Sequence, residues 1–234
     1  MMYTGYMGAV YFDWTFYALL AAMLLSFYAQ IKTKLTFNKY AKKTVHSGFT
    51  AQDAAKKVLD DNSVAGVSFG KISGNLTDNF NPKTNHISLS DSVYDKRSVA
   101  AVGVACHEAG HAVQHDAAYV PAKLRMAMVP VTNFGARLSM PLLLIGFFLG
   151  LMGLVWLGIA LFSLSTLFQL VTLPTEFDAS RRALRALTET GVLEKDEIKG
   201  AKRVLSAAAM TYVAALASSA IMLLRYVAMS KRRR

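Results

Sequence analysis

The chain has 234 residues, of which 53% are apolar, and carries a formal net charge of +11 from 26 basic and 15 acidic residues. Its mean hydropathy of +0.31 favours a membrane protein over a water-soluble domain. The basic residues crowd the ends of apolar tracts, as membrane-flanking charges do, and no nucleic-acid-binding module is recognisable, so we expect no nucleic acid partner. A single cysteine, Cys106, excludes an internal disulfide.

The apolar residues concentrate in long tracts that predict membrane-crossing helices. Trp14 to Ile31 contains no charged residue and is long enough for one span, so we expect a membrane anchor helix at residues 14–31. The Ala-rich tract Leu205 to Leu224 predicts a C-terminal membrane helix at residues 205–229, with a buried core helix as the alternative. No Lys or Arg precedes the first tract and no small-x-small cleavage site follows it, which indicates a retained anchor rather than a secretory signal.

The longest apolar tract, Met140 to Leu173, is too long for one span. As a single helix it would extend about 51 Å, well beyond a hydrocarbon core of about 30 Å. We therefore expect a membrane hairpin of two antiparallel spans at residues 138–173, with its turn at Gly150-Leu151-Met152-Gly153.

Positive charges near the membrane ends predict the orientation. Lys and Arg are more numerous on the side of the polar regions, which places these regions in the cytoplasm of a bacterial cell. Four spans would put Lys231 to Arg234 on the opposite side, against this rule. Either the last tract does not cross fully, or the majority count misleads.

Residues 32–137 form the largest polar region, where we expect a small α+β structure. Thr50 predicts the start of a helix. Alternating apolar and polar residues at 67–72 and 86–90 predict two strands, with turn chemistry at 81–85 between them. An exposed edge of strand 86–90 could bind an extended peptide by adding a strand, and an ordinary structural hairpin is the alternative.

The segment His107-Glu108-Ala109-Gly110-His111 has the HExxH pattern, within a stretch of small and apolar residues that predicts a buried helix. Residues four apart lie on one helical face about 6 Å apart, so both imidazoles can bind one metal ion. Zn²⁺ would lower the pKa of a bound water to about 7, and Glu108 could then act as the general base. The alternatives are histidines that only form hydrogen bonds, and a metal site without catalysis.

Two neighbours of the motif are not expected to bind the metal. His115 lies about 12 Å from His107 along the helix axis, too far for convergence on one ion. A longer motif with a third His would need that residue at position 117, which is Ala117. Cys106 points about 100° away around the helix and is expected to be a small buried residue.

A catalytic zinc takes three protein ligands and a water, so a further ligand is expected from another segment. Within the second polar region, 174–204, Glu176 stands apart because it follows the long apolar tract and opens a helix. The other glutamates there, Glu189, Glu194 and Glu197, lie in an ordinary charged stretch. A helix-start carboxylate favoured by the helix dipole is the alternative role for Glu176.

Three segments, HEAGHAVQH, FQLVTLPTEFDASRRAL and GAKRVLSAAAMTYVAA, resemble the YugP-type family of zinc-dependent membrane peptidases, with similarity from about residue 20 to about residue 225. The resemblance implies zinc ligation by His107 and His111, with Glu108 as the catalytic base. The family is in turn similar to the gluzincins, including HtpX-like membrane proteases. That similarity implies Glu176 as the third zinc ligand.

The chain departs from the HtpX-like pattern after the ligand Glu. In those proteases an Asp lies four residues after the ligand Glu. In this chain that position is Ser180, and Asp178 lies two residues after Glu176. Either Asp178 or Ser180 could support a zinc-bound His. Arg181, Arg182 and Tyr212 are candidates for stabilising an oxyanion.

We therefore expect a mostly α integral membrane protein, with about four membrane helices including a central hairpin, and a small α+β zincin-like catalytic region. The expected function is a Zn²⁺-dependent endopeptidase that hydrolyses peptide bonds of membrane or membrane-adjacent proteins, with a role in protein quality control by analogy. The alternative is a non-catalytic, zinc-stapled membrane scaffold or chaperone-like protein.

Overall fold

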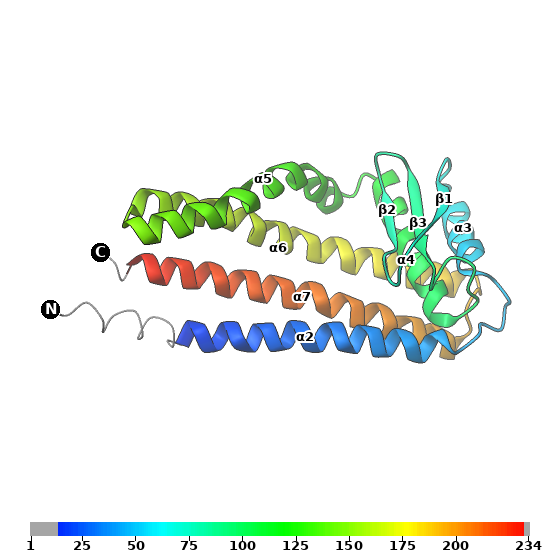
Figure 1. The fold of residues 1–234 in the computed structure, drawn as a ribbon. Helices are drawn as coiled ribbons and strands as arrows, with labels where there is room; N and C mark the ends of the chain where they lie inside the picture. The colour runs from blue at the N-terminus through cyan, green and yellow to red at the C-terminus, as the bar shows by residue number, and fades with distance from the viewer. Residues whose placement is uncertain (1–13, 232–234) are drawn as a thin grey trace. The chain divides into compact units, whose positions relative to one another are not determined.

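The computed structural model describes residues 14–231 (Figure 1). In chain order its elements are α2 (Trp14–Ala41), α3 (Ala51–Asp61), β1 (Ser68–Ile72), β2 (Asn79–Asn81), β3 (His86–Ser90), α4 (Val99–Asp116), α5 (Val120–Leu149), α6 (Met152–Glu189) and α7 (Lys195–Lys231). They divide into two compact units. The membrane unit comprises residues 14–29, 124–173 and 211–231, and the polar unit comprises residues 30–123 and 174–210.

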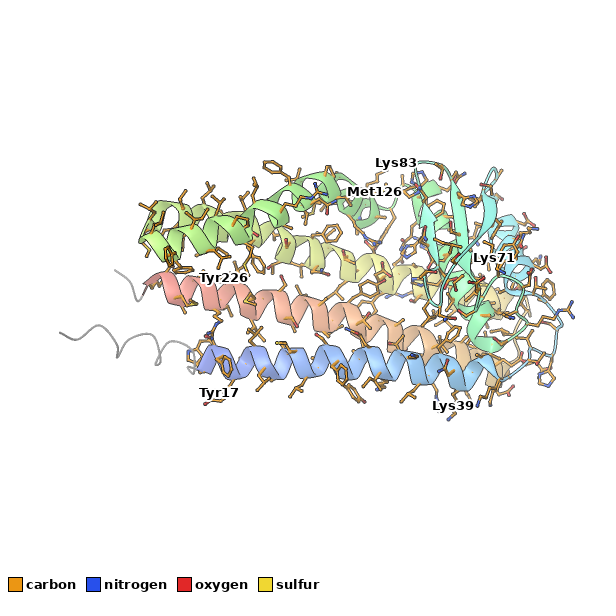
Figure 2. The ribbon with its side chains drawn as sticks, viewed as in Figure 1. Tyr17, Lys39, Lys71, Lys83, Met126 and Tyr226 are labelled. Carbon is orange, nitrogen blue, oxygen red and sulfur yellow. The ribbon has the colours of Figure 1, made fainter. Side chains whose placement is uncertain are left out.

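Within the described residues, four helices, α2, α5, α6 and α7, are long and apolar enough to cross a membrane. At most 22% of the residues in any of their apolar windows are buried. Large apolar side chains instead project outward, as Tyr17 does with 59% of its surface exposed (Figure 2). Such extensive apolar exposure suits contact with lipid. The expected mostly α membrane protein with a small α+β region is therefore confirmed.

The longest apolar tract forms the expected hairpin, with α5 and α6 joined through Gly150 and Leu151. Gly150 has a φ of +72°, a left-handed conformation that glycine adopts without strain. The Leu151 N–H donates to the Gly146 carbonyl at 2.9 Å and so closes the end of α5. Leu143 of α5 and Val155 of α6 share a buried cluster, and the two helices run side by side and antiparallel (Figure 1).

The polar unit contains a three-stranded sheet in the order β1-β3-β2. β1 pairs in parallel with β3, whereas β2 pairs antiparallel with it, Phe80 lying opposite Ile87. The expectation that strand 86–90 offers an exposed edge is wrong, because β3 is the central strand. The turn chemistry before β3 closes a hairpin with β2 instead of β1. This three-residue strand was not predicted, since it is too short to show alternation.

One apolar core holds the polar unit together. It gathers Val58 from α3, Leu89 from β3 and Val102 from α4. Leu187 from the end of α6 and Val204 from the start of α7 join the same cluster. Burying these side chains together stabilises the contact between segments that are distant in the sequence. The segment that carries Glu176 is thereby packed in the same unit as the HExxH helix.

Candidate metal centre

The HExxH residues lie on α4, as predicted. Ser98 caps the start of this helix, where its hydroxyl accepts a hydrogen bond from the Ala101 N–H at 3.3 Å. The helix packs in the core through small residues, and Cys106 among them is fully buried. Burial raises the pKa of the Cys106 thiol, and Cys106 is not one of the described residues whose ligand atoms converge.

Three side chains converge at one point of the polar unit: His107, His111 and Glu176. Their ligand atoms all lie within 4.8 Å of one another. His107 Nε2 is 3.3 Å from Glu176 Oε2, and His111 Nε2 is 3.6 Å from the same oxygen. Both imidazoles therefore present the same type of nitrogen to one carboxylate. Two imidazoles and one carboxylate are the donor set of many catalytic zinc sites, in which water takes the fourth position.

The electrostatics of this group favour a bound cation. Glu176 is only 2% exposed, and a buried carboxylate needs a compensating positive charge. Burial alone would lower the pKa of His111, but its hydrogen bond with Glu176 and the charge of that carboxylate outweigh burial and raise the pKa. A proton or a metal ion can supply the positive charge that this cluster lacks.

A close approach of two helices brings Glu176 to the histidines. Gly110 of α4 lies directly against Ala179 of α6: a Cβ at Gly110 would be 2.6 Å from the Ala179 carbonyl oxygen. A side chain there would push the two backbones apart. The glycine inside the HExxH segment therefore has a packing role that sequence reasoning did not identify.

Each histidine has a partner on its other ring nitrogen. His107 Nδ1 lies 3.1 Å from the Ser180 hydroxyl, and His111 Nδ1 lies 3.1 Å from Gln114 Oε1. A hydrogen bond from Nδ1–H leaves the Nε2 lone pair free for a metal ion and fixes the orientation of the ring. Ser180 is one of the two residues that the sequence suggests for this support, whereas Gln114 is not among them.

Gln114 connects α4 to α6 beside the metal ligands. Its buried Nε2 donates to the Thr175 carbonyl at 2.8 Å and to Asp178 Oδ2 at 2.9 Å. Arg182 Nε donates to the same Asp178 oxygen at 2.6 Å. Asp178 thus contacts His111 only through Gln114. Gln114 could have been recognised in the sequence as a lone amide side chain in the apolar part of the helix, three residues after His111.

Glu108 lies on α4 between the two histidines in sequence and is 8% exposed. Burial raises the pKa of Glu108, the charges of His111 and His107 oppose this, and those of Glu176 and Asp78 add to it. A raised pKa brings a carboxylate closer to the value that a general base needs near neutral pH.

Asp78, the residue before β2, contributes to this environment and was not predicted. Ser90 N and Ser90 Oγ donate to its two carboxylate oxygens at 2.7 and 3.0 Å. These bonds fix the carboxylate, and burial raises its pKa.

The described converging group does not include the remaining candidates. His115 is exposed and packs its ring 6.0 Å from that of Phe80 on β2. It is not one of the three converging residues. Among the residues considered for oxyanion stabilisation, Arg182 is bonded to Asp178, Arg181 is exposed and Tyr212 belongs to the membrane unit.

The family described as "Putative neutral zinc metallopeptidase" matches residues 15–231 of the chain. The "Putative membrane protease YugP" of Bacillus subtilis strain 168 is 44% identical over 208 residues, which cover 89% of this chain and 92% of that relative. No solved structure matches the chain.

The first prediction concerns the carboxylate ligand. Glu176→Ala removes one of three converging donors, so we expect zinc affinity to fall by more than about 100-fold, beyond the loss typical of supporting residues. Competition with a chromogenic chelator measures it. Glu189→Ala, an exposed glutamate on the same helix, is the control. Unchanged zinc affinity of Glu176→Ala would mean that Glu176 is only a helix carboxylate.

The second prediction concerns the support of His111. Gln114→Leu keeps most of the side-chain volume but removes the acceptor of the His111 Nδ1 proton, so we expect zinc affinity to fall about 10-fold to 100-fold. His115→Leu changes the next residue, which is exposed, and should leave affinity unchanged. Thermal unfolding of each variant, measured with and without zinc, separates lost metal binding from a general loss of stability. Equal zinc affinities for both variants would contradict the assigned role.

Proposed function

We propose that this chain, which belongs to the putative neutral zinc metallopeptidase family, is a membrane endopeptidase that hydrolyses peptide bonds by the attack of water. Zinc is the cofactor of the family, and the donor set on α4 and α6 fits that ion. The observation that carries the proposal is the convergence of His107, His111 and Glu176 within 4.8 Å. Together with a glutamate in the HExxH position, this set supports the proposal of a gluzincin-type site.

His107, His111 and Glu176 would hold the metal. When bound there, zinc supplies a Lewis acid that lowers the pKa of water at its open position and polarises the substrate carbonyl. Ser180 and Gln114 keep the two imidazoles oriented for that task.

Glu108 would move the proton. As a carboxylate with a raised pKa beside the three ligands, it accepts a proton from the attacking water and transfers it to the leaving amine. It contributes no atom to the converging group, so its proposed role is separate from metal binding.

A polypeptide substrate would be held in extended form. β2 is an edge strand of the described sheet and lies beside the end of α4, where Phe80 contacts His115. An extended segment can pair with such an edge through backbone hydrogen bonds. Since the same chain has four candidate membrane helices, membrane or membrane-adjacent proteins are the proposed substrates. A role in protein quality control rests on analogy alone.

A second function is favoured by one feature of the site. Its ligands come from two helices, α4 and α6, which are far apart in the sequence. A bound zinc would therefore also hold these two helices together. A non-catalytic scaffold stapled by zinc would use the same three residues. It would have no use for a carboxylate at Glu108, which makes that residue the basis of the discriminating experiment.

The third prediction tests catalysis. Glu108→Gln keeps the size of the side chain but cannot accept a proton, so we expect turnover to fall by a factor of about 100 or more with zinc content nearly unchanged. Cleavage of a random peptide mixture by the purified protein is followed by mass spectrometry. Full activity in this variant would contradict the proposed proton transfer. Absence of cleavage by the unaltered protein, with a zinc-dependent melting temperature, would favour the scaffold.

The fourth prediction tests the orientation. We propose that the polar unit faces the cytoplasm of a bacterial cell, because Lys and Arg concentrate on that side. A membrane-impermeant maleimide should then label Leu151→Cys in the hairpin turn of intact cells, and Lys83→Cys only after permeabilisation. The native Cys106 is buried and gives little background. Labelling of Lys83→Cys in intact cells would reverse the assignment.

A further inference from the structure

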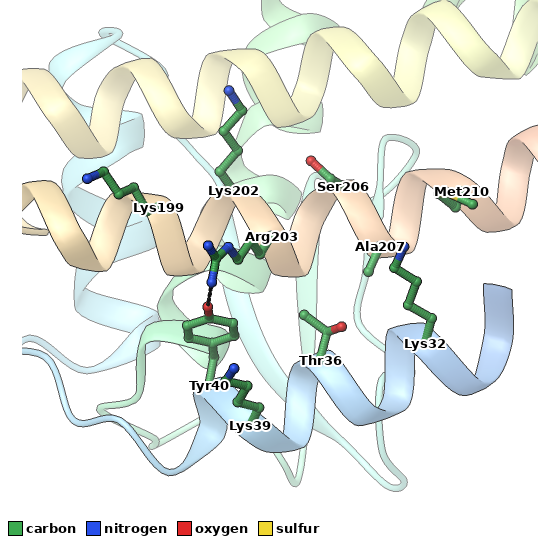
Figure 3. A pocket seen from close by; sticks show the side chains of 10 residues that line it. All are labelled: Lys32, Thr36, Lys39, Tyr40, Lys199, Lys202, Arg203, Ser206, Ala207 and Met210. Carbon is green, nitrogen blue, oxygen red and sulfur yellow. Dashed lines mark hydrogen bonds between the residues drawn. The ribbon is translucent and has the colours of Figure 1, made fainter. Parts of the chain in front are cut away.

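The polar unit contains a second feature, separate from the metal centre: a cavity of about 540 Å³ between α2 and α7. Figure 3 shows the side chains that line it. Five are cationic: Lys32, Lys39, Lys199, Lys202 and Arg203. Among the described residues that line the cavity there is no Asp or Glu, so the charged side chains of these walls are all positive.

The cations come from the facing sides of two helices. On α2, Lys32, Thr36 and Lys39 are spaced by four and three residues and so share one helical face. On α7, Lys202 and Arg203 follow Lys199 by three and four residues and so lie on the same helical face as Lys199. Two helices that pack side by side usually meet through apolar residues or opposite charges, because like charges repel. Here both sides are basic.

Four of the five cations form no ion pair with a protein carboxylate. Among residues 14–231, no ion pair involves Lys39, Lys199, Lys202 or Arg203. Arg203 Nη1 instead donates to the Tyr40 hydroxyl at 2.9 Å (Figure 3). Tyr40 is only 5% exposed, so a buried phenol orients the guanidinium of Arg203. The other N–H groups of the Arg203 guanidinium can donate hydrogen bonds to an anion.

The cavity also lies where the helices change from apolar to polar. Lys32 directly follows the uncharged tract that ends at Ile31, and on α7 the lining ends at Met210, inside the apolar tract that begins at Leu205. Thr33 Oγ1 donates to the Ala207 carbonyl at 2.9 Å and ties the two helices together at this level. Basic residues at such a transition meet the phosphate layer of a bilayer.

We propose that this cavity is a binding site for the phosphate group of an anionic ligand. Lysine ammonium groups and an oriented guanidinium are the donors that phosphate oxygens prefer. The phosphate could belong to a lipid headgroup at the bilayer surface or to a soluble phosphate compound. The site does not depend on the proposed peptidase activity, since it shares no residue with the metal centre.

The test uses purified full-length protein in detergent with two kinds of probe. Native mass spectrometry measures binding of phosphatidylglycerol, with zwitterionic phosphatidylcholine as the reference lipid. Isothermal titration with inorganic phosphate, in the absence of lipid, measures binding of the free anion. Binding of phosphatidylglycerol alone identifies a lipid headgroup as the source, and binding of inorganic phosphate identifies a soluble one. Either result supports the proposal when it depends on the cavity.

The dependence is tested with two double variants of equal charge. Lys39→Gln with Lys202→Gln removes one cation from each wall of the cavity. Lys34→Gln with Lys42→Gln removes two exposed cations that do not line the cavity, one on α2 and one directly after it. We expect the cavity variant to bind the probe about 25-fold more weakly, at roughly fivefold for each lysine, and the control variant to lose less than about threefold.

Thermal unfolding without a probe gives an independent reading. Removing two like charges from the cavity should raise the melting temperature more than the control change does, because mutual repulsion falls. Zinc content of both variants confirms that the polar unit is folded. Equal losses of binding in the two double variants, or no binding of either probe by the unaltered protein, would overturn the proposal.

Discussion

The contact between α4 and α6 at Gly110 and Ala179 is the constraint on which the metal centre depends. It sets the helices close enough for Glu176 to lie 3.3 Å from His107 and 3.6 Å from His111. Any side chain at Gly110 would separate the backbones, and a displacement of about 1 Å is large for metal coordination, in which bond lengths are held within about 0.2 Å. The packing of two helices thus determines whether three scattered residues form one site.

The membrane hairpin makes this contact compatible with the chain order. The HExxH helix ends before α5, and Glu176 comes after the apolar part of α6, so the chain must leave and return between them. The turn at Gly150 allows that return within the membrane unit. The membrane helices therefore do more than anchor the protein, because their connection places both ligand-bearing segments in the polar unit.

The polar unit contains two opposite electrostatic demands. At the metal centre a buried carboxylate faces two imidazoles and requires a cation. In the cavity between α2 and α7, five cationic side chains lie together with no carboxylate among the described lining residues. A buried carboxylate is costly without a compensating cation, and neighbouring cations repel one another, so each cluster favours a ligand of the opposite charge.

The sequence by itself determined the features that depend on local spacing and tract length. The four-residue interval of His107 and His111, the membrane hairpin and its turn at Gly150 all follow from helix geometry and bilayer thickness. Tertiary structure decided the features that depend on pairing between distant segments. The central position of β3, the contact of Gln114 with α6, and the meeting of cations from α2 and α7 have no local pattern. Such contacts arise only when separate helices and strands pack on one core, because neither partner's sequence specifies the other's position.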